Sequence, residues 1–160
     1  MKYFLLALLL GACSFAAFGC DCLMPPIQEH IRQTPFLLRA TATQLLDGAS
    51  QESRDHRQFV RSMNPQADTV TRGHEARIRI EEDYKGLLKA GDMLDISSHY
   101  SNCELTFQVG QQYLLFLHQE NGKFFITMCS YSEQLDGSSA VNNVLEMIQQ
   151  ESKKKRKRTK

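Results

Sequence analysis

The stretch YLLFLHQENGKFFITMC (residues 113–129) decides the fold of this chain. Two apolar runs, residues 113–118 and 124–129, flank Glu120-Asn121-Gly122-Lys123. An Asn-Gly pair between two such runs is a strong signal for a β-hairpin with a tight turn. The stretch therefore predicts two strands joined directly to each other.

Further short strands are predicted on either side of polar connections. Residues 36–46 are rich in Leu and Thr and end at Asp47-Gly48. From His74 apolar and charged residues alternate through residue 81, which is typical of a half-buried strand. Residues 94–98 and 105–109 predict two more strands. Residues 49–73 are polar with little periodicity, so we expect a long loop or a flexible hairpin tip.

The last apolar pattern has helical rather than strand spacing. Val141, Val144, Leu145 and Ile148 follow Ser138-Ser139, which predicts an amphipathic helix with a serine cap. Five or six short strands followed by one helix predict a mainly β domain, built as a small, mostly antiparallel closed barrel.

The N-terminus has the features of a secretory signal peptide. Lys2 precedes an apolar run, and Ala17-Phe18-Gly19 is an acceptable cleavage site. Residues 1–19 are therefore predicted to be removed, which leaves Cys20 first in a mature chain of about 140 residues. That length suits a single domain with its own core. We expect a secreted protein with no transmembrane segment in the mature chain.

Two other interpretations of the leader remain open. Residues 16–20 fit a loose lipobox, so in a bacterium Cys20 would carry a lipid and the protein would be a periplasmic lipoprotein. A retained leader would be barely long enough to span a bilayer.

Four cysteines remain after cleavage: Cys20, Cys22, Cys103 and Cys129. An exported domain with an even cysteine count normally oxidises them, and four cysteines allow three pairings. Pairing Cys20 with Cys22 would close a small strained ring. Closing loops of about a hundred residues would stabilise the fold by about 4 kcal/mol each.

Cys20-Asp21-Cys22 at the mature start allows two interpretations. In the first, the cysteines only staple the terminus to the fold. A disulfide at Cys20 would also fix its terminal amine and carbonyl in space, as two hard ligands that point outward.

The charge of the chain is divided between an acidic body and a basic tail. Residues 153–160 hold seven of the 19 basic residues and Lys2 is another, so residues 20–152 carry 11 basic and 18 acidic residues. The tail is either a polyanion contact or a disordered solubilising end. The basic side chains that would contact a polyanion or an anionic surface are Lys153, Lys154, Lys155, Arg156, Lys157 and Arg158.

Five segments in the same order resemble the tissue inhibitors of metalloproteinases, within the netrin-like domain family. They cover the mature body, residues 20–150, and are Cys20-Asp21-Cys22, Phe36-Leu37-Leu38-Arg39-Ala40, Tyr84-Lys85-Gly86, Gly110-Gln111-Gln112-Tyr113-Leu114-Leu115-Phe116 and Ile126-Thr127-Met128-Cys129-Ser130.

The resemblance implies an OB-fold barrel with disulfides Cys20–Cys103 and Cys22–Cys129. It also implies a non-enzymatic inhibitor, without catalytic residues or cofactor, whose partner is a zinc metalloproteinase. A catalytic zinc keeps one position open for water. The Cys20 amine and carbonyl would take that position, with Asp21 and Cys22 completing an inhibitory wedge.

Three departures from the family favour an alternative. Asp21 stands where the family has Ser or Thr, and a carboxylate in an apolar pocket costs free energy. Ile31 and Arg32 lie where the family has a third cysteine, and the family's C-terminal domain is replaced by the basic tail. The alternative is a non-inhibitory netrin-like binding module, lipid-anchored at Cys20 or tethered by its tail.

Other chemistries are disfavoured. The five histidines lack ligand spacing, so His74 and His99 are expected on exposed strand faces and the chain is expected to hold no metal of its own. The aromatic residues are expected in the core rather than on a base-stacking platform, and the acidic body disfavours specific nucleic-acid binding.

Overall fold

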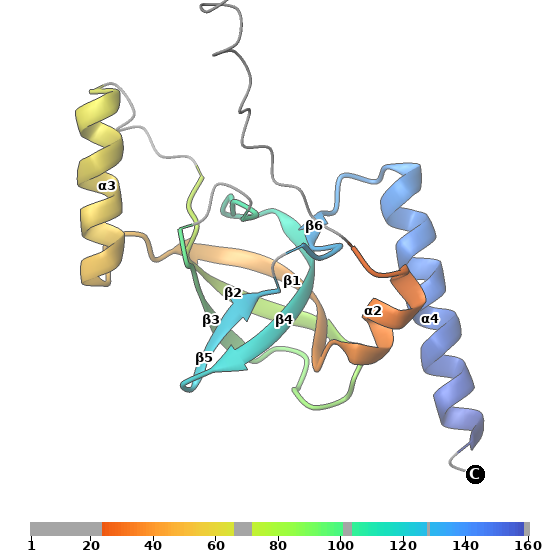
Figure 1. Ribbon diagram of the computed structural model, residues 1–160. Coiled ribbons are helices and arrows are strands. Elements are labelled where there is room, and N and C mark those ends of the chain that lie inside the picture. Colours follow the sequence, from red (N-terminus) through yellow and green to blue (C-terminus); the bar gives the residue numbers. More distant parts are fainter. Residues whose placement is uncertain (1–23, 66–71, 101–103, 128, 159–160) are drawn as a thin grey trace, which may run out of the picture.

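The protein is described by a computed structural model at residues 24–65, 72–100, 104–127 and 129–158. Within these ranges it is a mainly β domain with helices outside a barrel (Figure 1). In chain order the elements are α2 (Ile27–Gln33), β1 (Phe36–Leu45), α3 (Gln51–Met63), β2 (Ala76–Asp83), β3 (Met93–Ser97), β4 (Gln112–Glu120), β5 (Lys123–Ile126), β6 (Glu133–Gln134) and α4 (Ser139–Arg158).

Five strands close the barrel. The order is β1-β2-β3-β5-β4, and β4 pairs again with β1, while β6 adds two residues beside β4. β1 is long enough to pair on both sides, and its register against β2 shifts twice, at Arg39/Ala40 and at Ala42/Gln44. Such shifts bend a strand and let it follow the curvature of a barrel.

The barrel is mixed rather than antiparallel. All pairings except one are antiparallel, but β3 and β5 run parallel. The expectation of a closed, mostly antiparallel barrel therefore holds, and it is corrected only at the parallel β3–β5 pairing. β5 runs parallel to β3 because β4 lies between them in the sequence. The β4–β5 hairpin reverses the chain and brings β5 alongside β3 in the same direction.

Alternate side chains of each strand fill the barrel interior, as the two-residue period of a strand requires. Apolar side chains of β1, β2 and β4 form this core with Ile96 and Phe107. Tyr113 is fully buried there, and its hydroxyl accepts a hydrogen bond from Gln108 N at 2.7 Å. The largest contributors from the strands are Leu38, Ile78, Ile80, Tyr113, Leu115 and Leu117.

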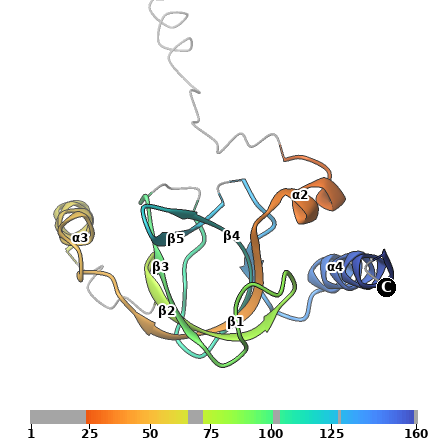
Figure 2. The same ribbon diagram turned by 90° about the horizontal axis from the view of Figure 1, so that it is seen from below.

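A second apolar cluster lies outside the barrel, beneath α2 and α4. Ile27 and Ile31 of α2 and Val144 and Ile148 of α4 pack on outward-facing side chains of β1 and β4, which are Leu37, Leu114 and Phe116. Figure 2 shows α2 and α4 together on one side of the barrel and α3 on the opposite side. The two helices thus bury one part of the outer barrel surface and leave the rest open.

The predicted hairpin and terminal helix are confirmed. Asn121 and Gly122 both have positive φ, 49° and 79°, and Glu120 pairs with Lys123 across the turn. This is the geometry for which an Asn-Gly pair is favoured. The strands predicted at residues 36–46, 74–81 and 94–98 correspond to β1, β2 and β3. α4 begins at Ser139, and Val141 N donates to Ser138 Oγ at 3.4 Å.

Two predictions are corrected. The stretch expected to be a loop contains α3, which Ser50 caps by accepting a hydrogen bond from Ser53 N at 3.1 Å. Its helical character is hard to see because Phe59, Val60 and Met63 are its few large apolar residues. Residues 105–109 are not a strand of the sheet. Phe107 instead forms one isolated bridge with Gly73.

Three features were not predicted. α2 and β6 are both short, with few residues in which a period can be recognised. α4 continues to Arg158, so residues 153–158 of the basic tail are helical, whereas a disordered end was one of the two interpretations of that tail. Lys and Arg are good helix formers, and cations are favourable near a helix C-terminus. In the described part of the chain, no helix combines the length and the apolar character that a membrane span requires.

Candidate functional site

The three residues of the predicted wedge, Cys20, Asp21 and Cys22, lie outside the described residues. Cys103, the predicted disulfide partner of Cys20, lies outside them as well. Cys129 is described, is disulfide-bonded, and has a positive φ of 54°. The pairings Cys20–Cys103 and Cys22–Cys129 therefore stay predictions.

The chain that directly follows the predicted wedge is anchored to the barrel at two points. Tyr131, two residues after Cys129, donates a hydrogen bond from its hydroxyl to Pro25 O at 3.1 Å. Lys85 Nζ donates to Ile31 O at the C-terminal end of α2 and to Arg32 O at 3.4 Å. Carbonyls in the last turn of a helix lack partners within the helix, so a lysine there is stabilising.

The turn that holds Lys85 is itself fixed. The Asp83 carboxylate accepts hydrogen bonds from Lys85 N at 2.8 Å and from Leu87 N and Leu88 N at 2.6 Å each. Burial raises the pKa of Tyr84 to about 12, and its backbone N donates to Leu37 O at 3.0 Å. The Tyr84-Lys85-Gly86 segment thus connects α2 to the barrel.

His30, on α2, packs between the helix and the barrel. Its ring packs edge-on against Phe116 at 5.0 Å and against Tyr131 at 5.8 Å between centroids. Neither ring nitrogen has a hydrogen-bond partner among the described residues, and burial lowers the pKa of His30. Burial therefore favours the neutral form of the imidazole through which α2 contacts the barrel.

The predicted polyanion contact, Lys153–Arg158, falls in the last part of α4. Figure 1 shows this end of α4 extending away from the barrel. Its role in binding stays a prediction.

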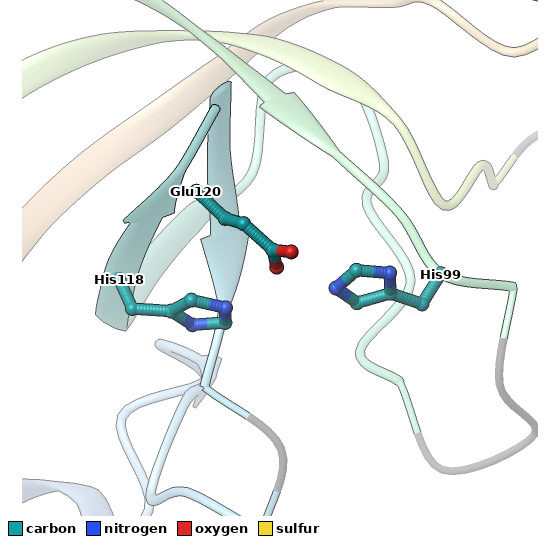
Figure 3. Close-up of side chains that lie close together, drawn as sticks. All are labelled: His99, His118 and Glu120. Atoms are coloured by element: carbon teal, nitrogen blue, oxygen red, sulfur yellow. The ribbon is translucent and has the colours of Figure 1, made fainter. Parts of the chain in front are cut away.

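Three side chains that the sequence analysis did not connect converge outside the barrel: His99, His118 and Glu120. Their nitrogen and carboxylate oxygen donor atoms lie within 4.8 Å of one another. Figure 3 shows the two imidazoles and the carboxylate turned toward a shared space. His99 and Glu120 are exposed and His118 is half-buried. Two imidazoles and one carboxylate are a ligand set typical of transition-metal ions.

The barrel determines how these three side chains meet. His118 and Glu120 are two residues apart on β4, so they point to the same face. That face is the outer one, which Leu114 and Phe116 share farther along the strand beneath the helices. His99 lies two residues after the end of β3. Because β3 pairs with β5, and β5 pairs with β4, this places His99 beside the end of β4.

Both imidazoles rest on the ring of Phe125. His99 stacks on it with ring centroids 4.2 Å apart and an interplanar angle of 8°, and His118 stacks at 5.8 Å and 23°. Glu104 fixes the backbone at His99, because its carboxylate accepts a hydrogen bond from His99 N at 2.9 Å and another from the Ser98 hydroxyl. The imidazoles are therefore held by packing rather than free in solvent.

A cleft of about 480 Å³ adjoins the cluster and shares His99, Glu120 and Phe125 with it. Glu75 and Tyr100 also line the cleft. Burial raises the pKa of Glu75 and raises that of Tyr100 to about 12. The cleft therefore combines an exposed carboxylate with a buried one.

Tyr100 lies at the centre of an aromatic group beside this cleft. It has a φ of 53°, which is uncommon for a bulky residue. Its ring stacks on His56 of α3 at 4.7 Å and contacts His74 at 5.9 Å. The group attaches the N-terminal half of α3 to the barrel.

The expectation that His74 and His99 lie on exposed strand faces is wrong for His74, which is half-buried and precedes β2. For His99, which follows β3, only the exposure is correct. One sequence feature points to the cluster, namely His118-Gln119-Glu120 at the end of a predicted strand, because residues i and i+2 share a face. Nothing in the sequence connects His99 to them, since their proximity depends on the parallel β3–β5 pairing.

Comparisons with known proteins give no family assignment. No protein-family model matches this chain, and no curated protein sequence matches it.

Proposed function

We propose that the chain is a secreted, non-enzymatic inhibitor of zinc metalloendopeptidases. The mature terminus would act as the inhibitory wedge, with the Cys20 amine and carbonyl on the zinc of the target. Two observations support the proposal. The strand order β1-β2-β3-β5-β4, closed by β1, is consistent with an OB-fold-like barrel, and the segment after Cys22 is anchored to that barrel.

The anchoring of the segment after Cys22 to the barrel is the stronger of the two observations. An inhibitor that enters a cleft must hold its reacting groups in place before binding, because ordering them on binding costs affinity. Pro25 follows Cys22 by three residues and is hydrogen-bonded to Tyr131, which follows Cys129 by two. This proximity favours the proposed Cys22–Cys129 disulfide. A second disulfide, Cys20–Cys103, would then fix the first residue.

The terminal amine is the essential group in this mechanism. A free amine has a lone pair for the metal, whereas a peptide nitrogen has none to donate. Occupying the open zinc position would displace the water that the protease uses for hydrolysis. Asp21 would point toward the pocket beside the zinc, where its desolvated carboxylate weakens binding.

Inhibition of a panel of zinc endopeptidases tests the proposal. We expect the wild-type exported protein to inhibit and a variant with one alanine added before Cys20 to lose inhibition, because the added residue converts the amine to a peptide nitrogen. Circular dichroism checks that the extended variant is folded. If the extended protein inhibits as well as the wild type, inhibition does not use Cys20.

Asp21→Thr tests the role of the second wedge residue. Removing the carboxylate should tighten binding by about 1–3 kcal/mol. Asp92→Thr, in the exposed turn before β3, is the matched control and should leave inhibition unchanged. If the wild type inhibits no protease and Asp21→Thr gains nothing, the non-inhibitory netrin-like binding module replaces the inhibitor.

Intact mass and non-reducing peptide mapping of the exported protein test the chemistry of the terminus. We expect a free amine on Cys20 and the linkages Cys20–Cys103 and Cys22–Cys129. A lipid on Cys20 would contradict the inhibitor and favour an anchored binding module. A Cys20–Cys22 bridge would contradict both the pairing and the fixed wedge.

A further inference from the structure

We propose that His99, His118 and Glu120 form a binding site for a divalent transition-metal ion of the Zn²⁺ type. The site belongs to this chain and is separate from the proposed contact of Cys20 with the zinc of a protease. It rests on the position of three described side chains and does not depend on the proposed function.

The ligand set determines the class of ion. Imidazole nitrogens suit Zn²⁺, Co²⁺, Ni²⁺ and Cu²⁺, whereas Ca²⁺ and Mg²⁺ take oxygen ligands. Two imidazoles with one carboxylate supply three ligands, which leaves a fourth position for water or for a donor from another molecule. The ion itself would occupy the space that Figure 3 shows between the three side chains.

The geometry needs only a small contraction to bind the ion. The donor atoms lie within 4.8 Å of one another, and in a tetrahedral zinc site such atoms lie about 3.3 Å apart. Glu120 is exposed, so its carboxylate can move the remaining distance toward the two imidazoles. Phe125 holds both imidazoles, and Glu104 holds the backbone at His99, which reduces the ordering that binding requires.

The surrounding charges have a predictable effect on affinity. Glu52, Glu75 and Glu120 line the adjoining cleft, and Lys123 is its one lysine. Lys123 pairs in register with Glu120 across the hairpin turn, so its positive charge lies near the cluster and opposes the binding of a cation there. Removing that positive charge should strengthen metal binding.

Calorimetric titration of the metal-free exported protein, with its disulfides intact, tests the site. The probes are Zn²⁺ and Co²⁺, and Co²⁺ also reports nitrogen ligation by its absorption spectrum. We expect one ion to bind per chain. His118→Ala and Glu120→Gln should each weaken binding by about tenfold or more, and Lys123→Met should tighten it.

Matched controls distinguish this site from general histidine binding. His56→Ala on α3 and Glu146→Gln on α4 remove the same groups outside the cluster and should leave the affinity unchanged. In a Zn²⁺ titration followed by NMR, the imidazole signals of His99 and His118 should shift while that of His30 does not.

Three results would overturn the proposal. The first is a wild-type chain that binds neither probe ion. The second is a His118→Ala variant that binds as tightly as the wild type. The third is binding that is lost when alanine is added before Cys20, which would place the ion at the chain terminus instead.

Discussion

Gly73→Ala tests a carboxylate clamp at the base of the long β1–β2 connection. The Asp47 carboxylate accepts hydrogen bonds from His74 N at 2.9 Å and from Glu75 N at 3.2 Å. A Cβ at residue 73 would lie 2.0 Å from Asp47 Oδ2 and 2.8 Å from its Cγ. Because the φ of Gly73 is outside the left-handed region, alanine introduces no backbone strain. The substitution should destabilise the fold because the Asp47 carboxylate must move away from the new Cβ and so loses its two hydrogen bonds.

The magnitude follows from the two hydrogen bonds that are lost. A hydrogen bond to a charged group contributes about 1.5–3 kcal/mol, and water reaches these partly exposed N–H groups. We therefore expect Gly73→Ala to lower the free energy of unfolding by about 2–4 kcal/mol. Asp47→Ala removes the same two bonds and should cost about as much.

The double variant separates this mechanism from a general packing defect. Without the Asp47 carboxylate, the nearest atom to a Cβ at residue 73 is Leu45 Cδ2, at 3.3 Å. The two changes should therefore be non-additive by about 2–3 kcal/mol in urea unfolding at an unchanged m-value. If their costs add to within about 0.5 kcal/mol, the clamp does not explain the effect.

Three further changes have defined outcomes. Tyr113→Phe removes the acceptor of Gln108 N and should cost about 1–3 kcal/mol in urea unfolding; an unchanged midpoint would contradict the role of that hydrogen bond. Burial lowers the pKa of His30, so the unfolded chain binds more protons and stability should fall as pH drops below 6.5. His30→Leu should flatten this decline, and a decline of unchanged size in that variant would contradict the assignment. Burial raises the pKa of Glu75, so stability should fall as pH rises above 4.5, and Glu75→Gln should remove that fall in a pH series of unfolding curves.

The strands could be predicted where their information is local. Asn121-Gly122 specifies its own turn, and the alternation from Ala76 to Glu81 is set by one buried face. Helix α3 could not be predicted in this way, because its contacts with the barrel are polar and aromatic. Ser53 is buried at its N-terminal half and His56 stacks on Tyr100, while Phe59 is exposed. A helix that is this polar, with few large apolar residues, offers little of the apolar pattern by which a surface helix is recognised in a sequence.

The histidine–carboxylate cluster could be predicted only in part, for a different reason. His118 and Glu120 are local to one strand, but His99 joins them through a pairing between strands that are not consecutive. Parallel pairing is not encoded by a turn. The β3–β5 pairing follows from how the whole barrel closes, which short sequence patterns do not specify. The predicted wedge is the opposite case, since its motif is local but its geometry would depend on the predicted disulfides of Cys20, Cys22 and Cys103.

One strand, β4, connects the core, the helical layer and the cluster. Its residues 113, 115 and 117 face the interior, residues 114 and 116 lie under the helices, and residues 118 and 120 continue the outer face. A slip of one residue would exchange these faces and bury His118, so the core fixes the register. The Asn121-Gly122 turn then places His118 opposite Phe125 on β5. Because β5 pairs with β3, this also brings His118 to His99, which follows β3. Closure of the barrel therefore assembles the proposed metal ligands, with no need for a local binding motif.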